Sequence, residues 1–483
     1  MSHQEVTDVP KGLYIAGRWR GASDGATFGV TDPATGQRLA DVASATVEDA
    51  LAAVGAADAA GKAWAATAPR ARSDILRRAF ELLIQRKEAF ARLIVLESGK
   101  ALAEARGEVG YAAEFLRWYA EEAVRIVGEV STAPGGANRI LVLRQPIGVA
   151  VFVTPWNFPA AMATRKIGPA LAAGCTVVLK PASETPLTAL ALAALFEEAG
   201  VPAGVVNVLP SRQSGPVVAA MLHDPRVRKL SFTGSTGIGR VLLAQAAHNV
   251  VKCSMELGGN APFIVFADAD LEAAVAAAMV AKLRNGGESC TAANRYYVER
   301  PVADEFSRRF AAAMASVKVG PGLDETVQLG PLINGAALDK VAQLVGEAVA
   351  QGATVVTGGS ARPGPGYFYE PTLLTGVAPG ARILREEIFG PVAPVCVFDT
   401  VDQAVALAND TQYGLVAFVH TRDLARALAV SERIEAGMVG INRGVVSDPA
   451  APFGGWKQSG VGREGGHDGL LEYLESKYVC VDW

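Results

Sequence analysis

The sequence predicts an α/β fold with parallel sheets that helices cover on both faces. From residue 148, short apolar runs rich in β-branched residues alternate with helical segments of about ten to fifteen residues. A similar alternation returns between residues 262 and 440, which predicts a second α/β region. A chain of 483 residues is too long for one hydrophobic core, so about two to four domains or subdomains are expected.

Helices are expected to dominate the residues before this region. Residues 46–66 begin with Thr46 and Asp49 at the spacing of a capping box and continue as an alanine-rich helix. Residues 70–126 have the pattern of amphipathic helix, interrupted around Ser98 and Gly99.

The first alternating region predicts one parallel sheet. Its expected strands are GVAVFVTP, CTVVLKP, VVNVLP, KLSFTG and CSMELGG. Its helices are expected near 165–173, at 185–200, near 214–223 and near 236–247. The uncharged run from Pro146 to Thr164 is nearly as long as a membrane span, but its three prolines disfavour a helix in lipid. We interpret this run as a buried strand followed by a turn.

The second region is expected to place its strands at APFIVF, ANRYYVE, GATVVTGG, APVCVF and GLVAFVH, with a Gly/Pro-rich loop over 358–368. The C-terminal YVCVDW predicts a short strand, and an exposed strand end is a liability unless it is paired. Two arrangements stay open at this point. The strand either pairs with another element, including one in a partner subunit, or forms an edge strand in its own chain.

Composition excludes several classes of function. Apolar residues make up 50% and charged residues 19%, which is typical of a soluble globular protein. A net charge of −4 without a basic run argues against nucleic-acid or membrane partners, and the N-terminus lacks the pattern of a signal peptide. Five distant cysteines without CxxC, and histidines without ligand spacing, argue against disulfides and metal sites and favour the cytoplasm.

Two glycine- or lysine-containing turns follow predicted strands. FTGSTGIGR (232–240) opens a helix where backbone N–H groups could face a pyrophosphate, although it lacks the order G-x-G-x-x-G. LKPASETP (179–186) places Lys180 at a strand end beside a possible helix cap at Ser183 or Thr185. Each turn alone is equally compatible with a packing glycine or a solvated lysine. Together they favour a ligand at the carboxyl ends of the strands.

Three residues could carry chemistry. Cys290, in NGGESC, could attack a carbonyl from a tight turn, although a lone cysteine is more often structural. No histidine can be singled out as its partner, which disfavours a papain-like hydrolase. Glu256 in MELGGNAP is a carboxylate in an apolar strand, and the amide of Asn157 in TPWNFP is a suitable oxyanion donor. Spacing alone does not bring these three residues together.

The motifs TPWNFP, KPASETP, FTGSTGIG, MELGGN, NGGESC, EEIFGP and PFGGWKQSGVGREGG occur in this order over about 310 residues. In this set and order the chain resembles the aldehyde dehydrogenase superfamily. The resemblance implies a Rossmann-like NAD(P) domain (about 1–126 and 147–257) and a catalytic domain (about 258–465). It also implies a small β oligomerisation segment (127–146 with 466–483), whose C-terminal strand extends a partner's sheet in a homodimer or homotetramer.

The resemblance also implies a role for each matching residue. Cys290 is then the nucleophile that forms a thiohemiacetal and a thioester, Asn157 N–H₂ and the Cys290 N–H hold the oxyanion, and Glu256 is the base for hydrolysis. NAD or NADP is the implied cofactor. The residues implied in binding it are Thr154, Pro155, Trp156, Lys180, Ser183, Gly215, Phe232, Gly234, Ser235, Ile238, Leu257, Glu387 and Phe389.

Two positions depart from the family pattern. Many members carry Gln where Glu288 stands, and an ionised carboxylate there could raise the pKa of Cys290. We interpret Glu288 as a tolerated variant that points away from the thiol. Ser183 stands where NAD-preferring members often carry a glutamate, so room for a 2′-phosphate makes NADP use plausible without excluding NAD.

Arg165, Arg284 and Ser447 match the two arginines and the serine of succinate-semialdehyde dehydrogenases. Arginine suits the distal carboxylate of an ω-carboxylated aldehyde, whereas the alternative for each arginine is a structural ion pair. Succinate semialdehyde is therefore the expected substrate. Glutarate semialdehyde, 2-oxoglutarate semialdehyde and an aldehyde without a carboxylate remain alternatives, as does a catalytically silent binding or structural protein. Glu256 disfavours a CoA-acylating enzyme, and Ala292 leaves Cys290 without a neighbouring thiol for a disulfide switch.

Overall fold

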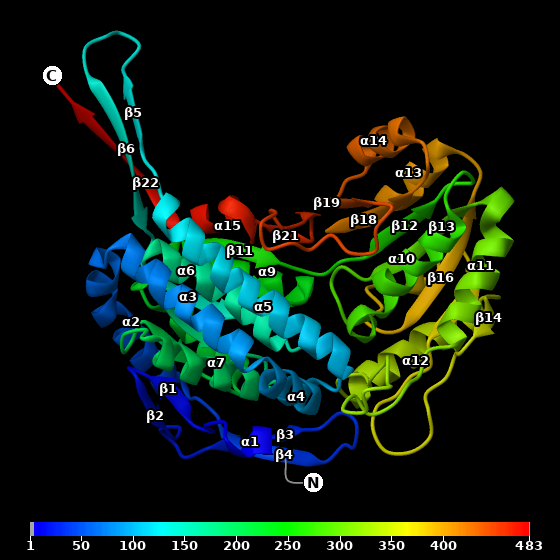
Figure 1. Cartoon of the computed structure of the whole chain (residues 1–483), viewed down its shortest axis with the longest axis horizontal. Helices are drawn as coiled ribbons and strands as arrows, with labels where there is room; N and C mark the ends of the chain where they lie inside the picture. Colours follow the sequence, from blue (N-terminus) through cyan, green and yellow to red (C-terminus); the bar gives the residue numbers. More distant parts are fainter. Residues whose placement is uncertain (1–3, 483) are drawn as a thin grey trace.

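The computed structural model describes residues 4–482, and two open sheets organise them (Figure 1). The central strands β9, β8, β7, β10 and β11 of the first sheet are parallel, and β1, β2 and β21 are antiparallel to their neighbours. In spatial order the sheet contains β2 (Arg18–Arg20), β1 (Leu13–Ile15), β9 (Val206–Val208), β8 (Thr176–Lys180), β7 (Val149–Val153), β10 (Val227–Thr233), β11 (Lys252–Glu256) and β21 (Gly460–Val461).

Helices bury both faces of this sheet, as its continuous apolar strands predict. The core on one face includes residues of α2 (Val47–Ala66), α8 (Ser214–His223) and α9 (Thr236–Ala246). The core on the other face includes residues of α3 (Pro69–Gln85), α4 (Lys87–Ser98), α5 (Leu102–Glu122), α6 (Pro159–Ala173) and α7 (Pro186–Ala199). The α/β prediction is confirmed, and so is the capping box, because Thr46 and Asp49 exchange both of its hydrogen bonds.

The uncharged run from Pro146 holds the predicted buried strand, β7, and then the predicted turn, a bend at 156–158, but the following helix starts earlier than predicted. Helix α6 begins at Pro159, six residues earlier than expected, with proline in its first turn and all of its residues buried. Proline lacks the N–H that a first helical turn leaves unpaired, so it starts this helix instead of breaking it. Within residues 4–482, no helix combines the length and apolar character that crossing a membrane needs.

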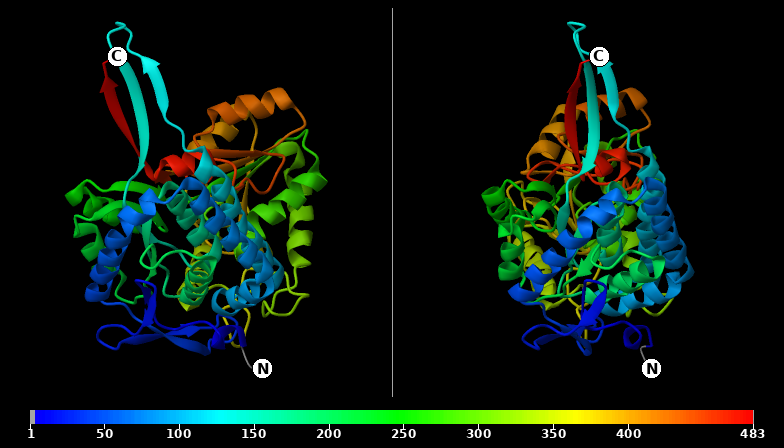
Figure 2. Two further views of the ribbon diagram at one scale, coloured as in Figure 1. Left: turned by 60° about the vertical axis from the view of Figure 1, so that its left-hand side comes forward. Right: turned by 90° about the vertical axis from the view of Figure 1, so that its left-hand side faces the viewer.

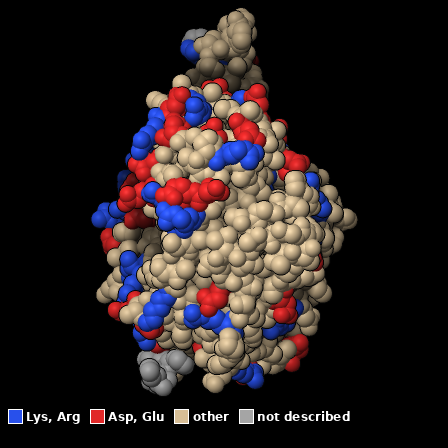
Figure 3. All heavy atoms as spheres, turned by 90° about the vertical axis from the view of Figure 1, so that its right-hand side faces the viewer, with Lys and Arg blue, Asp and Glu red and all other residues tan. Residues whose placement is uncertain are grey.

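The second sheet is parallel except for its edge strand β14. Its spatial order is β14 (Thr354–Thr357), β15 (Thr372–Thr375), β16 (Val392–Phe398), β13 (Ala293–Glu299), β12 (Ala261–Val265), β18 (Val416–His420) and β19 (Met438–Ile441). The helices of this half are α10 (Leu271–Leu283), α11 (Arg300–Ala315), α12 (Gly335–Ala350), α13 (Val401–Asn409) and α14 (Leu424–Arg433). On the face of this half in Figure 3, positive and negative side chains are interspersed around a broad uncharged area.

A three-stranded antiparallel arm rises from the body (Figure 2). It contains β5 (Glu129–Thr132), β6 (Arg139–Pro146) and the C-terminal β22 (Leu474–Val481). Strand β22 pairs with β6 of its own chain from Leu474↔Pro146 to Val481↔Arg139. One edge of β22 is therefore hydrogen-bonded to β6 of its own chain, and no strand among the described residues pairs with its other edge.

Several short elements were not predicted from the sequence. They include the strands β1 and β2 and the hairpin of β3 (Thr27–Thr31) and β4 (Arg38–Ala43). The chain after β19 also returns to the first sheet. Strand β21 pairs with β11, and α15 (Gly466–Leu471) contacts α5 and α6. The remaining elements are α1 (Gln4–Thr7), η1 (Ala123–Arg125), η2 (Ala247–Asn249), η3 (Arg284–Gly287), η4 (Arg382–Leu384), and the paired β17 (Tyr413–Gly414) and β20 (Trp456–Lys457).

Candidate active site

A cavity of about 400 Å³ lies between the two halves of the molecule, and residues from both line it. Twelve of the residues singled out from the sequence are on its wall: Pro155, Trp156, Asn157, Arg165, Gly234, Ser235, Leu257, Arg284, Cys290, Glu387, Phe389 and Ser447. Seven are not: Thr154, Lys180, Ser183, Gly215, Phe232, Ile238 and Glu256.

The turn that carries Cys290 begins at η3. Asn285, Gly286 and Gly287 have φ of 56°, 67° and 78°, so three successive residues adopt the left-handed region. A side chain at Gly287 would put its Cβ 2.3 Å from the Gly390 carbonyl oxygen, which leaves glycine as the residue that fits. This turn delivers the half-buried Cys290 to the cavity wall just before β13 starts.

The thiol of Cys290 is protonated at neutral pH in this setting. Burial raises its pKa to about 12, the carboxylate of Glu387 adds to that effect, and the positive charge of Arg165 opposes it. Attack on a carbonyl therefore requires that the thiol lose its proton to a base or a water during the reaction.

Asn157 is held next to this turn by bonds on its backbone and its side chain. Its Nδ2 donates to the Glu288 carbonyl oxygen at 2.9 Å, which leaves the second N–H of the amide free for another acceptor. Its own carbonyl oxygen accepts from Lys100 Nζ at 2.7 Å and from Asn285 Nδ2 at 3.0 Å. The amide is thus oriented before any substrate binds, as an oxyanion donor must be.

Glu256, at the end of β11, directly precedes the wall residues Leu257 and Gly258 and does not itself line the cavity. Neither of its carboxylate oxygens has a hydrogen-bond partner among residues 4–482, although the side chain is buried. Burial raises its pKa well above the ordinary value, and the nearby Glu464 adds to the rise, while Lys166 and Arg165 oppose it. A buried carboxyl of this kind holds a proton more tightly than an exposed one, and its carboxylate is a stronger base.

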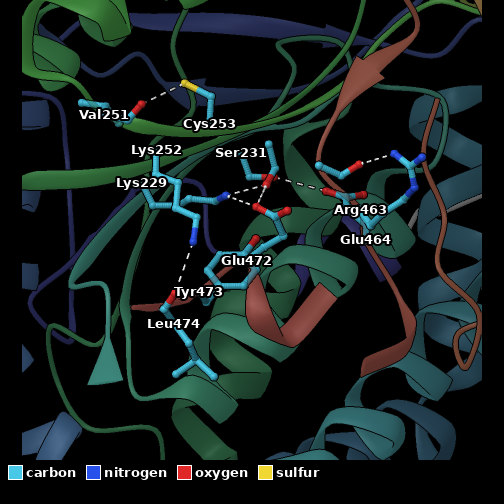
Figure 4. Close-up of polar contacts among 12 residues, drawn as sticks. Lys229, Ser231, Val251, Lys252, Cys253, Arg463, Glu464, Glu472, Tyr473 and Leu474 are labelled. Carbon is cyan, nitrogen blue, oxygen red and sulfur yellow. Dashed lines mark hydrogen bonds and ion pairs between the residues drawn. The ribbon is translucent and has the colours of Figure 1, made fainter. Parts of the chain in front are cut away.

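Polar residues stand at alternating positions of β10 and β11 on the face that carries Glu256, and Figure 4 shows Lys229 and Ser231 of β10 with their partners. Glu464 forms a buried ion pair with Lys166 and accepts a bond from Ser231 Oγ at 3.2 Å. One step along the strands, Lys229 pairs with Glu472 at 2.9 Å, and Ser254 Oγ donates to the same carboxylate at 2.8 Å. These bonds fasten the returning segment of the chain to the sheet beside Glu256.

Arg165 and Arg284 reach the cavity from different elements. The guanidinium of Arg165 lies 4.2 Å from the centre of the Phe453 ring, bonds to the hydroxyl of Tyr111, and is 3.7 Å from Glu464. The guanidinium of Arg284 lies 5.1 Å above Phe158. In the described residues no carboxylate forms an ion pair with Arg284. The cavity wall therefore presents a cation without a charge partner.

Glu387 and Phe389 also line the cavity. The Glu387 carboxylate accepts from the Gly259 N–H at 3.1 Å, its backbone oxygen accepts from Lys340 Nζ at 2.7 Å, and burial raises its pKa to about 7. Phe389 has a φ of 57°, which is uncommon for an aromatic residue, and packs edge-on against Trp156 at 5.4 Å. Backbone strain of this kind persists only where surrounding contacts hold it, often at ligand sites.

The chain also offers groups that fit a dinucleotide. Helices α8 and α9 begin just after β9 and β10, and a Cβ added at Gly215 or Gly237 would meet no atom within 4 Å. Lys180 is a buried cation at the end of β8 whose pKa burial lowers to about 8, so an anion would stabilise it. Helix N-termini and a buried lysine at the carboxyl ends of parallel strands suit a pyrophosphate.

The structure adds wall residues that sequence reasoning missed. They are mainly aromatic or come from distant helices: Tyr111, Phe158, Met162, Ile333, Asn334, Lys340 and Phe453. Phe158 and Phe453 lie within the quoted motifs TPWNFP and PFGGWKQSGVGREGG, and this membership was the signal that the sequence offered. Tyr111 and Ile333 lie in segments whose local pattern is that of ordinary helix or loop, so the sequence contained no signal for them.

Glu288 makes a bond that the sequence did not predict. Its Oε1 accepts from the backbone N–H of Ile333 at 3.0 Å, and burial raises its pKa to about 8. At neutral pH this carboxyl is therefore mostly uncharged, like the glutamine that it replaces.

Comparison with known proteins agrees with this geometry. Residues 19–479 match the model of the aldehyde dehydrogenase family. A succinate-semialdehyde dehydrogenase of Paenarthrobacter nicotinovorans is 57% identical over 92% of this chain and 98% of the relative. A glutarate-semialdehyde dehydrogenase of Pseudomonas aeruginosa is 49% identical over 97% of each chain. The crystal structure of an NADP-dependent enzyme of Escherichia coli superposes with a TM-score of 0.97, at 49% identity and 98% coverage of both chains.

Proposed function

The chain belongs to the aldehyde dehydrogenase family, and from this premise we propose that it oxidises succinate semialdehyde to succinate. The family and the relatives establish an enzyme that oxidises an aldehyde to a carboxylic acid with NAD or NADP. The observation that supports the more specific proposal is Arg284. It is a cation on the cavity wall that lacks a carboxylate partner within residues 4–482, and it shares that wall with Arg165, Ser447 and Cys290.

In the proposed reaction, Cys290 Sγ attacks the aldehyde carbon and forms a thiohemiacetal. The second N–H of Asn157 and the N–H of Cys290 hold the oxygen as negative charge develops on it, because both are donors that need no reorganisation. NAD(P)⁺, when bound, would supply the hydride acceptor: the former aldehyde carbon loses its hydrogen with two electrons, the oxygen loses any proton it carries, and a thioester remains. Glu387, Phe389, Trp156, Gly234 and Ser235 would hold the nicotinamide end of the cofactor, and Lys180 the phosphate end.

Glu256 would then take a proton from the water that attacks the thioester carbon. The carbon–sulfur bond breaks, the acid leaves, and Cys290 regains its thiol. Because Glu256 does not line the cavity, its unpaired carboxylate has to reach the cavity through a water or a side-chain rotation. Its raised pKa suits this task, because a carboxylate with a raised pKa accepts a proton from water more readily than an ordinary one.

A substrate matrix tests the proposal. Purified wild type would be assayed with succinate semialdehyde, glutarate semialdehyde and butanal, each against NAD and NADP. Loss of one charge-assisted bond is worth about 1.5–3 kcal/mol, so Arg284→Met should lower kcat/KM for the carboxylated aldehydes by about 10–150-fold and for butanal by less than about threefold. Arg300→Met is a matched control, because Arg300 is exposed and pairs with Asp399.

Two results would contradict the proposal. Equal kcat/KM for succinate semialdehyde and butanal in the wild type would mean that the enzyme does not recognise the distal carboxylate. If Cys290→Ala still reduced NAD(P), the whole Cys290 mechanism would be wrong. The same matrix ranks NAD against NADP, for which the neutral Ser183 beside Lys180 favours NADP.

We also propose that the arm joins subunits in a dimer or tetramer. Its outer strand β22 has an open edge, and Val130, Leu143, Tyr478 and Val481 on the arm are exposed. Unpaired backbone and exposed apolar side chains are stabilised when a partner's strand covers them. Light scattering on wild type and on a chain that ends at Tyr473 should give an oligomer and a smaller species, respectively. Equal masses would contradict this role.

A further inference from the structure

Glu288 lies where four segments of the chain meet. The nucleophile turn and the loop before α12 come from the second half of the molecule, and the Asn157 loop and Gly99–Lys100 come from the first. The contacts are close enough that glycine is needed: a Cβ at Gly330 would lie 2.0 Å from the Gly99 carbonyl oxygen. Glu288 itself is 4% exposed, so each polar group around it depends on a protein partner.

The backbone and the side chain of Glu288 bind different segments. Its carbonyl oxygen accepts from Asn157 Nδ2 and from Asn285 Nδ2, both at 2.9 Å. Its carboxyl oxygen accepts from Ile333 N–H at 3.0 Å. One residue therefore links the amide of Asn157, the turn that carries Cys290 and the loop that precedes α12.

The loop at Ile333 is connected through α12 to other parts of the cavity wall. Ile333 and Asn334 line the wall, and Asn334 caps α12 by accepting from the Ala337 N–H at 2.9 Å. Further along α12, Lys340 donates to the carbonyl oxygen of Glu387 at 2.7 Å. A shift at Ile333 would thus move both the wall opposite Cys290 and the loop that carries Glu387.

We propose that Glu288 is a positioning residue that fastens the nucleophile turn to Ile333, and thereby sets the distance of Cys290 and Asn157 from the α12 side of the cavity. This inference rests on the proposed role of Cys290 as the nucleophile. Glu288 acts through its acceptor oxygen and not through a negative charge, because burial keeps the carboxyl mostly neutral near pH 7. The positive charge of Lys100 opposes this effect of burial. Glutamine offers the same acceptor at the same reach.

The test compares three substitutions. Glu288→Gln keeps the acceptor oxygen, Glu288→Asp withdraws it, and Glu288→Met removes it at similar size. Glu299→Met is the matched control. Glu299 also accepts a backbone N–H, that of Ala267 at 2.6 Å, but it stands at the far end of β13 from Cys290. For each variant, kcat and KM for aldehyde and cofactor, the melting temperature and the rate of Cys290 alkylation by iodoacetamide, read by peptide mass spectrometry, would be measured.

Glu288→Gln is expected to stay within about threefold of wild type in kcat, in both KM values and in alkylation rate. Because misplacement by about 1 Å costs on the order of 100-fold, Glu288→Asp and Glu288→Met should lower kcat by about 10–100-fold, with both KM values changed far less, and should change the alkylation rate. Glu299→Met should lower the melting temperature without lowering kcat.

Three results would overturn the inference: wild-type kcat and alkylation in Glu288→Met and Glu288→Asp, a Glu288→Gln variant as impaired as Glu288→Met, or an equal loss of kcat in Glu299→Met. If Glu288→Met does not fold, Glu288→Asp against Glu288→Gln decides the same point. Alkylation of Cys290 needs neither aldehyde nor cofactor. If the wild type oxidised no carboxylated aldehyde, the proposed substrate would therefore be wrong. The alkylation rates would still decide the Glu288 inference.

Discussion

Gly259 offers a direct way to displace Cys290 without touching its side chain. A Cβ added at Gly259 would lie 2.0 Å from the carbonyl oxygen of Cys290. The φ of Gly259 is outside the left-handed region, so alanine is not strained by its own backbone there. Gly259→Ala therefore shifts the Cys290 backbone and also the Gly259 N–H that donates to the Glu387 carboxylate, so the alkylation rate of Cys290, which needs no cofactor, reports the first effect separately.

The size of the effect follows from the contact distance. An ordinary contact for a Cβ begins at 3.4 Å, so the Cys290 carbonyl or the Gly259 backbone has to retreat by about 1.4 Å. Overpacking of this kind costs about 1–3 kcal/mol of stability. Misplacing a reacting group by about 1 Å costs on the order of 100-fold in rate, so kcat/KM should fall by about that factor.

The assay is the rate of NAD(P)H formation at 340 nm, together with the melting temperature and the alkylation rate of Cys290. Gly107→Ala is the control, because a Cβ at that position in α5 meets no atom within 4 Å and helix propensity favours alanine. A Gly259→Ala enzyme with kcat within twofold of wild type and unchanged alkylation would refute the reasoning.

Three further predictions concern Glu256, Glu97 and Thr46. Glu256→Gln should form about one equivalent of NAD(P)H per site in a rapid burst and then turn over about 100–10,000-fold more slowly, because the base for hydrolysis is lost; stopped-flow absorbance without a burst would contradict this. Burial raises the pKa of Glu97 to about 8, so the folded state keeps a proton that the unfolded state releases near 4.5. The wild type should therefore lose stability relative to Glu97→Gln as the pH rises from 5 to 8, and melting temperatures that keep a constant gap would argue against it. Thr46→Ala removes the cap of α2 and should cost about 1 kcal/mol in denaturant unfolding with kcat unchanged, whereas a loss below about 0.3 kcal/mol would mean that the capping box contributes little.

Local patterns were sufficient for most of the secondary structure. The strands β7 and β8 are mostly apolar runs followed closely by proline, and β10 and β11 mix apolar with polar residues and are followed closely by glycine. The helices between them have their own stop signals. The strands β1 and β2 span three residues each, too few for a period to emerge, so they were missed. The sequence pattern places the start of α6 six residues too late, because a proline in such a run is typical of a turn as well as of the first helical position.

The cavity required the tertiary structure. Asn157 and Arg165 lie just before and within α6, Cys290 lies more than a hundred residues later, and only the packing of the two halves brings them to one wall. The aromatic residues against Arg165 come from α5 and from the returning segment after β19, and nothing in their local sequence predicts that meeting. The sequence likewise does not predict that Leu257 and Gly258 line the cavity while Glu256 does not.

The sequence by itself determined the order of strands and helices, the glycine turn around Cys290 and the family motifs, because propensity, periodicity and turn chemistry act over a few residues. Only the tertiary structure decided which charges remain unpaired. Among the described residues, Arg284 has no ion-pair partner, whereas Arg165 and Lys166 both pair with Glu464. The Glu288 carboxyl accepts a bond from the Ile333 N–H. Such pairings depend on residues that are tens to hundreds of positions apart, and burial then sets the pKa of each group by removing water that no local pattern records.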